Sequence, residues 1–229
     1  MDLYGKKSSS IGQKILILSV EAVLLFIAYQ ILFNHWDREI YGWMSLPAPS
    51  GNHTRNTINF IYSCIVFSRI TFMMFFMMKR AIPTEEALTI PLAFAVYYIG
   101  FALFTVNADT PIGVTDILSI TIFIAGSFIN TFAEVQRHLW KEQPSHKGNL
   151  YTGGLFQYAV HINYFGDVLW VTGYAILAQT LWAGLIPVWL LGFFVFYNIP
   201  TLDLYLKEKY KEQFTTYRKT SKKIIPFIY

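Results

Sequence analysis

Polar side chains that could hold a ligand gather in one stretch of otherwise apolar sequence, residues 153–167, which read GGLFQYAVHINYFGD. Hydrogen-bonding groups are costly near hydrocarbon, so polar residues there usually face a bundle interior, a water-filled cavity or a ligand. In a helix, Gln157 and His161 stack one turn apart. Asn163 and Asp167 stack in the same way, which predicts a broad polar face. The alternative is a lipid-interface segment whose Tyr and His side chains lie at headgroup level.

The stretch resembles the segment that opens the last membrane helices in the steroid 5-alpha-reductase C-terminal family and in related bacterial membrane proteins of unassigned function. That superfamily also includes sterol reductases and isoprenylcysteine carboxyl methyltransferases. Its pattern is roughly G-L-[WF]-x-Y-S-R-H-P-N-Y-x-G-[ED], and Val160 and Ile162 stand where many members have Arg and Pro. The matching residues are His161, Asn163, Tyr164, Gly166 and Asp167. The resemblance implies cofactor contacts at His161, Asn163, Tyr164 and Asp167.

A second group of charged residues precedes this stretch. Glu134, His138 and Lys141 are spaced i, i+4, i+7, so they share one face if the preceding helix continues past the membrane. The run AEVQRHLWK resembles the family's cytoplasmic loop, which implies that Glu134 holds a ribose or adenine group and that Lys141 and Arg137 pair with phosphates. Asn149 stands where 5-alpha-reductases tend to have a second Arg. The alternative is a solvated juxtamembrane helix whose charges reach the lipid headgroups.

The C-terminal segment completes the resemblance. Apolar residues recur at near-helical spacing between lysines, which predicts an amphipathic helix lying at the inner membrane surface. They are Leu202, Leu206, Tyr210, Phe214 and Tyr217. The ending EKYKEQFTTYRKTSKKIIPFIY resembles the family's, and this implies that Tyr210 and Tyr217 contact the cofactor. Taken alone, the segment is more typical of a membrane-surface anchor.

Two charged residues stand alone in the apolar N-terminal half. Glu21 lies seven residues after Lys14, about 10 Å along a helix, and Arg69 lies ten residues before Lys79, about 15 Å. Both distances are measured from the same membrane face, so the two side chains could pair and reduce the cost of burying each charge. Tyr62 shares the helix face of Arg69. We therefore consider Glu21, Tyr62 and Arg69 as candidate catalytic residues.

Composition sets the class of protein. The chain of 229 residues is 54% hydrophobic, 18% aromatic and only 14% charged, which is too apolar for an ordinary soluble domain. Its one cysteine excludes an intramolecular disulfide, and no HExxH zinc pattern, P-loop or GxGxxG run is present, so we expect no metal site. The net charge of +4 is not a nucleic-acid signature, because the basic residues gather at one membrane face and suit anionic lipids or a phosphorylated cofactor.

Apolar runs predict an all-α membrane bundle of six transmembrane helices, or seven if the last one is divided further. The six predicted spans are Ile15–Phe33, Ile58–Met78, Ala87–Val106, Ile117–Ala133, and two more made by splitting residues 154–200 near Gln179–Gly184. With both termini in the cytoplasm, the outer loops hold only Arg38 and Arg55, as expected when basic residues collect inside. We expect residues 1–133 to face the substrate and residues 134–229 to bind the cofactor, within one integrated membrane domain of a bacterial inner membrane or endoplasmic reticulum. The sequence does not indicate an oligomeric state.

These features favour a membrane reductase that uses NADPH. Hydride transfer to a conjugated C=C of a lipophilic steroid-, enone- or polyprenyl-type substrate builds negative charge on the carbonyl oxygen, which Glu21, Tyr62 or Arg69 could offset. A polar nucleotide would enter from the cytoplasm, and the substrate from the bilayer.

Two other functions stay open. The first is a methyltransferase that uses S-adenosylmethionine and acts on a lipid or prenylcysteine carboxylate, although the chain has Lys207-Glu208-Lys209 where that branch of the superfamily has a paired acid. The second is a non-catalytic, lipid-binding relative, for which Val160, Ile162 and Asn149 are the expected kind of departures. Fold alone does not decide between them.

Overall fold

The computed structural model describes residues 9–229, which form two compact helical units. Unit 1 contains the described residues up to Ile117 together with Tyr174–Ala183, and unit 2 contains Leu118–Gly173 together with Gly184–Tyr229. Lys6 and Lys7, which the charge pattern places on the inner side, lie outside the described residues. Within residues 9–229 the regular structure is helical apart from one isolated bridge between Ala159 and Lys222. The all-α prediction is therefore confirmed.

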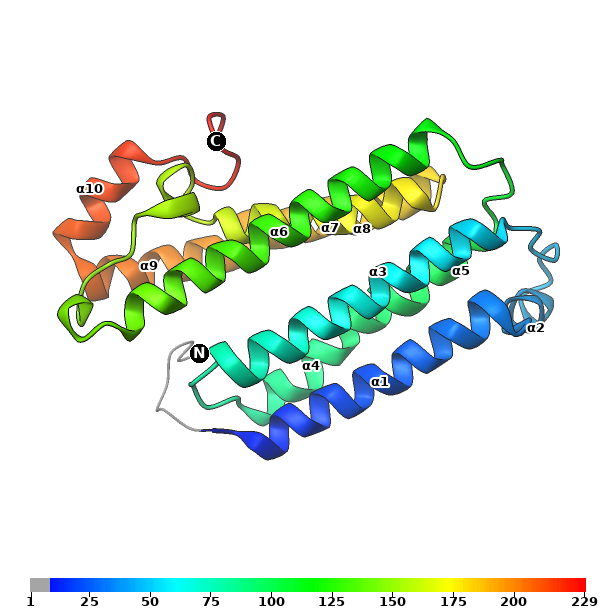
Figure 1. The fold of residues 1–229 in the computed structure, drawn as a ribbon, viewed down its shortest axis with the longest axis horizontal. Coiled ribbons are helices and arrows are strands. Elements are labelled where there is room, and N and C mark those ends of the chain that lie inside the picture. Colours follow the sequence, from blue (N-terminus) through cyan, green and yellow to red (C-terminus); the bar gives the residue numbers. More distant parts are fainter. Residues whose placement is uncertain (1–8) are drawn as a thin grey trace. The chain divides into compact units, whose positions relative to one another are not determined.

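Unit 1 is built on α1, which packs against both α3 and α4 (Figure 1). Its elements are α1 (Ile11–Phe33), α2 (Trp36–Trp43), α3 (His53–Phe72), the π-helical η1 (Met73–Met77), α4 (Thr84–Ala95), the π-helical η2 (Val96–Gly100) and α5 (Phe101–Thr105). Asn52 starts α3, because its side chain accepts hydrogen bonds from the backbone nitrogens of Thr54 and Arg55 at 2.9 and 3.4 Å.

A buried ion pair joins the start of α3 to the start of α6. Arg55 is fully buried, and its Nε and Nη2 donate to the two carboxylate oxygens of Asp116 at 2.8 and 2.9 Å. Its Nη1 also donates to the backbone oxygens of Ala108 and Thr110 at 2.7 and 3.1 Å. The prediction that placed Arg55 in a loop is wrong, because α3 already begins at His53; the side of the membrane on which Arg55 lies stays a prediction. A buried charge is tolerated only when paired and hydrogen-bonded in this way.

Unit 2 holds most of the two long helices α6 and α7 and all of the C-terminal elements. Its elements are α6 (Val114–Glu142), the short 3-10 helices η3 (Pro144–His146) and η4 (Gly154–Gln157), α7 (Ile162–Leu177), α8 (Leu185–Phe193), the π-helical η6 (Phe194–Asn198), α9 (Ile199–Tyr210) and α10 (Glu212–Thr220). The 3-10 helix η5 (Leu181–Gly184) turns the chain between α7 and α8. The first residues of α6 and the last of α7 belong to unit 1.

Two glycines let α6 and α7 approach closely within unit 2. A Cβ atom on Gly126 would lie 2.3 Å from the backbone nitrogen of Trp170, and one on Gly166 would lie 2.5 Å from the backbone nitrogen of Asn130. Backbone cannot move aside as a flexible side chain can, so any larger residue would push the helices apart. Small residues at such contacts are how membrane helices pack without a hydrophobic driving force.

Five helical segments are long and apolar enough to cross a bilayer, so the protein is a multi-pass integral membrane protein. Within the described residues these are Ile11–Phe33, His53–Met77, Thr84–Thr105, Val114–Glu142 and Leu181–Tyr210. Six spans were predicted, and the difference is α7. Its 16 residues are about 24 Å long, shorter than the roughly 30 Å hydrocarbon core. The predicted turn near Gln179–Gly184 is confirmed, whereas the sidedness of the loops stays a prediction.

Candidate functional site

The polar stretch before α7 is a turn rather than the start of a helix. Gly154–Gln157 form the 3-10 helix η4, and α7 begins only at Ile162. The backbone nitrogens of Val160 and His161 donate instead to the backbone oxygens of Lys222 and Lys223, at 2.9 and 3.0 Å. The prediction that Gln157 and His161 stack one helical turn apart is wrong for this reason: C-terminal backbone replaces the helical hydrogen bonds.

Asn163 and Asp167 do lie on one helix, and both point at other residues of unit 2. Asp167 Oδ1 accepts hydrogen bonds from Asn130 Nδ2 and Trp170 Nε1, each at 2.9 Å. Asn163 Nδ2 donates to Glu134 Oε1 at 2.9 Å. These side chains therefore connect α7 to α6, and the lipid-interface alternative does not describe them.

Glu134 connects this network to an arginine. Its other carboxylate oxygen pairs with Arg137, three residues later on α6. The Arg137 guanidinium lies 5.3 Å from the centre of the Phe156 ring, close enough for a cation–π contact. Lys141 is exposed in the last turn of α6. The structure thus joins Glu134, Arg137 and Asn163 by direct contacts, while Lys141 is close enough for its charge to interact with those of Arg137 and Glu134.

His161 is buried with only 1% of its surface exposed, and it contacts an acid that sequence reasoning missed. Its Nε2 lies 2.8 Å from Asp203 Oδ1 on α9, and Arg218 Nε lies 3.9 Å from the other oxygen. Burial lowers the pKa of His161; Arg218 and Lys223 add to this effect, whereas Asp203 opposes it. We conclude that the imidazole is neutral at pH 7 and donates its Nε2 proton to the carboxylate. Tyr164 completes the group, since its ring stacks on that of His161 at 5.7 Å.

The C-terminal segment is two helices rather than the single amphipathic helix that was predicted. Lys211, with φ +46° and ψ −116°, ends α9 and turns the chain into α10. This turn brings Tyr210 and Tyr217 into one apolar cluster with Phe156. The Tyr217 hydroxyl donates to the Phe156 backbone oxygen at 2.5 Å, and burial raises the pKa of this phenol. Both tyrosines therefore support the turn before α7.

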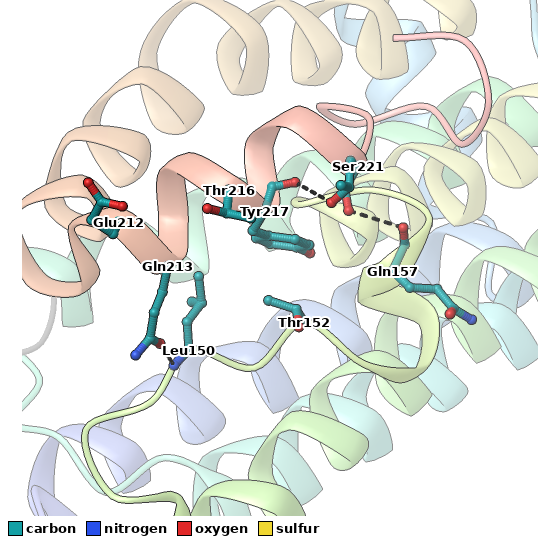
Figure 2. Close-up of a pocket in the computed structure, with 9 residues that line it drawn as sticks. Leu150, Thr152, Gln157, Glu212, Gln213, Thr216, Tyr217 and Ser221 are labelled. Atoms are coloured by element: carbon teal, nitrogen blue, oxygen red, sulfur yellow. Dashed lines mark hydrogen bonds between the residues drawn. The ribbon is translucent and has the colours of Figure 1, made fainter.

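An open groove of about 630 Å³ lies between α10 and the loop that leads to η4 (Figure 2). It is lined by Leu150, Thr152, Gln157, Glu212, Gln213, Thr216, Tyr217, Thr220 and Ser221. Gln213 ties the two walls together, since its Oε1 accepts from the Leu150 backbone nitrogen at 2.9 Å and its Nε2 donates to Asn149 Oδ1 at 3.3 Å. Ser221 Oγ donates to the Gln157 backbone oxygen at 3.1 Å. Of the predicted cofactor residues, Tyr217 lines the groove and Asn149 supports its wall.

The predicted catalytic residues lie in unit 1. Glu21 on α1 is fully buried and accepts a hydrogen bond from the Tyr98 hydroxyl at 3.5 Å; within the described residues its Oε1 has no hydrogen-bond partner. Tyr62 packs edge-on against the Tyr174 ring, with centroids 5.2 Å apart. The pairing of Glu21 with Arg69 stays a prediction. Tyr98 was missed because it lies 77 residues after Glu21 in the sequence.

Comparison with known proteins adds the family. Residues 72–221, which contain α7, the groove and the His161–Asp203 contact, match the family described as "Protein of unknown function (DUF1295)". The chain belongs to this family. A stretch of 89 residues of this DUF1295 protein is also 32% identical to a protein of Ustilaginoidea virens named "Probable O-methyltransferase ustE". That stretch is 38% of this chain and 31% of the relative, so the match spans about a third of the relative's length.

These matches fit part of what the sequence indicated. Membership of a membrane family without an assigned function is confirmed. The narrower resemblance to the steroid 5-alpha-reductase C-terminal family stays a prediction, and the comparisons lend no support to NADPH. The relative's name instead favours the methyltransferase that sequence analysis ranked second.

Proposed function

We propose that this protein is a membrane methyltransferase that uses S-adenosylmethionine to methylate an oxygen of a lipid-like acceptor. The relative named as a probable O-methyltransferase supports the reaction class. The bilayer-embedded helices support an apolar acceptor that reaches the enzyme from the membrane. The observation that carries the choice of cofactor is the chemistry of the groove beside α10.

The groove suits a cofactor without phosphates. Its lining contains one carboxylate, Glu212, together with hydroxyl and amide side chains, and includes neither lysine nor arginine. NADPH carries several phosphate charges, which proteins usually pair with Arg or Lys. S-adenosylmethionine carries a sulfonium, an ammonium, one carboxylate and a ribose diol, for which an acid and neutral hydrogen-bonding groups are suitable partners. The residues present therefore fit S-adenosylmethionine better than NADPH.

Several groups in the groove are free to bind. Within residues 9–229 the side chains of Glu212, Thr216 and Gln157 make no hydrogen bond, and all three are exposed. Glu212 could accept hydrogen bonds from an ammonium or from ribose hydroxyls, while Thr216 and Gln157 could each donate or accept. Tyr217 and Leu150 offer apolar surface to an adenine ring. When bound, S-adenosylmethionine supplies an electrophilic methyl group, and these residues would hold it in place.

Most of the residues that were predicted to contact the cofactor have partners within unit 2. Arg137 pairs with Glu134 and covers Phe156, so its charge is already neutralised by a neighbour. Asn163 and Asp167 connect α6 and α7, and His161 is held by Asp203. These contacts hold the start of α7 in place, and Gln157 in the turn just before it lines the groove. A cofactor site needs such support for precise positioning.

Ligand-dependent thermal stability tests the proposal. The detergent-purified protein is heated with S-adenosylmethionine, S-adenosylhomocysteine, NADPH, NADH or no ligand. A ligand at 100 times its Kd adds about 2.7 kcal/mol to the free energy of unfolding. For a chain of this length that corresponds to a rise of about 5–11 °C in Tm. We expect this rise with S-adenosylmethionine and S-adenosylhomocysteine alone.

Two variants with the same change of charge locate the site. Glu212→Gln should remove most of the ligand-induced rise, whereas Glu208→Gln, an exposed acid on α9 outside the groove, should keep it. A rise with NADPH alone would overturn the proposal in favour of the reductase. No rise with any of the four ligands would overturn it in favour of a non-catalytic, lipid-binding relative.

A further inference from the structure

A second groove lies at the C-terminal end of unit 2, and its lining includes basic side chains, unlike that of the first groove. It has a volume of about 450 Å³ and is formed by the last turn of α10 and the segment that follows. Its lining includes Arg218, Lys219, Lys222, Lys223, Ile228 and Tyr229. Four basic side chains thus lie within six residues of sequence, and none of the side chains that line the groove is acidic.

The cations of this groove are only partly neutralised. Arg218 lies 3.9 Å from Asp203, which also accepts a hydrogen bond from His161. Lys219 and Lys222 are exposed and pair with no acid among residues 9–229. Lys223 Nζ lies 3.4 Å from the Tyr229 hydroxyl, a neutral partner. The groove therefore keeps a positive potential that would attract an anion.

Exposed apolar side chains lie next to these cations. The C-terminal residues fold back on themselves, because the backbone nitrogens of Ile224 and Ile225 both donate to the Tyr229 backbone oxygen at 2.8 Å. The turn presents Phe227 and Ile228 outward, with 78% and 75% of their surfaces exposed. Phe227 also touches the ring of Tyr158, with centroids 5.5 Å apart. A soluble anion would gain nothing from this apolar surface, whereas a lipid would.

We infer that this groove binds the phosphate of an anionic phospholipid, with Lys219 and Lys222 contacting the headgroup and Phe227 and Ile228 lying against the acyl chains. Clusters of Lys and Arg beside a membrane helix bind anionic lipids, and adjacent aromatic and aliphatic residues enter the interface. The position of the groove in the chain also suits lipid binding, because its residues follow closely after the apolar segment Leu181–Tyr210, which is long enough to cross a bilayer. This groove adjoins the proposed cofactor groove, since Thr220 and Ser221 line both. The inference uses none of the residues assigned to the cofactor and does not depend on the proposed function.

Titration with lipids of different charge tests the inference. The full-length protein in a neutral detergent is titrated with phosphatidylglycerol, phosphatidylcholine or inorganic phosphate, and the rise in Tm gives an apparent affinity for each. Phosphatidylglycerol should raise Tm at lower concentration than phosphatidylcholine, and inorganic phosphate should have little effect. Each lysine near an anionic lipid surface strengthens binding roughly fivefold, so the double variant Lys219→Gln, Lys222→Gln should bind phosphatidylglycerol about 30-fold more weakly.

A matched double variant controls for overall charge. Lys147→Gln, Lys207→Gln removes two exposed cations of unit 2 that lie outside the groove and should keep the wild-type affinity. The inference is overturned if phosphatidylglycerol and phosphatidylcholine act equally on the wild type, or if both double variants lose affinity equally. A full effect from inorganic phosphate would also overturn it, since the site would then be one for a free anion. If Lys219→Gln, Lys222→Gln does not fold, Phe227→Ser should still weaken phosphatidylglycerol binding.

Discussion

Replacing Asp116 by Asn should strongly destabilise unit 1. The Arg55 guanidinium holds both oxygens of this carboxylate, at 2.8 and 2.9 Å, and the backbone nitrogen of Gly113 donates to one of them at 2.9 Å. In its better orientation, an asparagine would keep its oxygen near Arg55 Nη2 and Gly113. Its amide NH₂ would then face Arg55 Nε, a donor against a donor.

The size of the effect follows from these contacts. One charge-assisted hydrogen bond of about 1.5–3 kcal/mol is lost, and a buried N–H group is left without an acceptor. The cation itself also loses its counter-charge while remaining fully buried. Together these amount to about 3–5 kcal/mol, the range measured when one partner of a buried ion pair is removed. For a chain of this size, Tm should fall by about 6–20 °C.

Thermal unfolding in detergent, followed by circular dichroism, measures the loss. Asp109→Asn is the matched control, because Asp109 lies exposed in the same connection and should change Tm by less than about 2 °C. If Asp116→Asn lowers Tm no more than this control, the pair does not stabilise unit 1 and the reasoning from burial is wrong.

Three further changes test unit 2. Gly166→Ala should lower Tm by several degrees, because its Cβ would lie 2.5 Å from the backbone of α6. Gly192→Ala is the control and should leave Tm unchanged, because its Cβ would have no neighbouring atom nearer than 4.0 Å. Equal effects of the two substitutions would refute the close approach of α6 and α7. Lowering the pH from 7.5 to 5.5 should lower Tm through His161, because folding lowers the pKa of this residue. The buried neutral ring contributes stability above about pH 6.5, the pKa of an unfolded histidine, and this stability is lost as the pH falls. A His161→Gln variant should therefore show a smaller difference in Tm between the two pH values. Tyr217→Phe removes the hydroxyl that donates to the Phe156 backbone oxygen and should cost about 1 kcal/mol of unfolding free energy; an unchanged Tm would show that this hydrogen bond contributes nothing.

Local pattern predicted most of the membrane-spanning helices. The apolar runs ending near Phe33 and Met78 correspond to α1 and to α3 with η1, because a bilayer helix needs about 20 apolar residues in succession, and that is visible in sequence. The pattern failed at α7, where length alone could not show that backbone from Lys222 and Lys223 pairs with the residues before Ile162. Because α7 begins only at Ile162, its 16 residues are too few to span the hydrocarbon core.

Several contacts of the candidate site could not be predicted, because they join residues that are far apart in sequence. His161 and Asp203 are separated by 42 residues. The same holds outside the site for Arg55 and Asp116, which are 61 residues apart. No periodicity marks such a pair. The spacing of Asn163 and Asp167 did predict that they share a helix face, but not that Asn130 and Glu134 of α6 would be their partners. Polar residues that share a helix face are therefore weak evidence for a ligand contact, because they can bind a neighbouring helix instead.

The backbone pairing between residues 158–161 and 222–223 also sets an order of events during synthesis. The turn before α7 receives its hydrogen-bond partners from residues about 60 positions later in the chain. At roughly 5–20 residues per second, a ribosome needs about 3–12 s to make that interval. Until then the nascent chain carries open backbone donors beside the membrane, so this turn is one of the last parts of the protein to reach its final form.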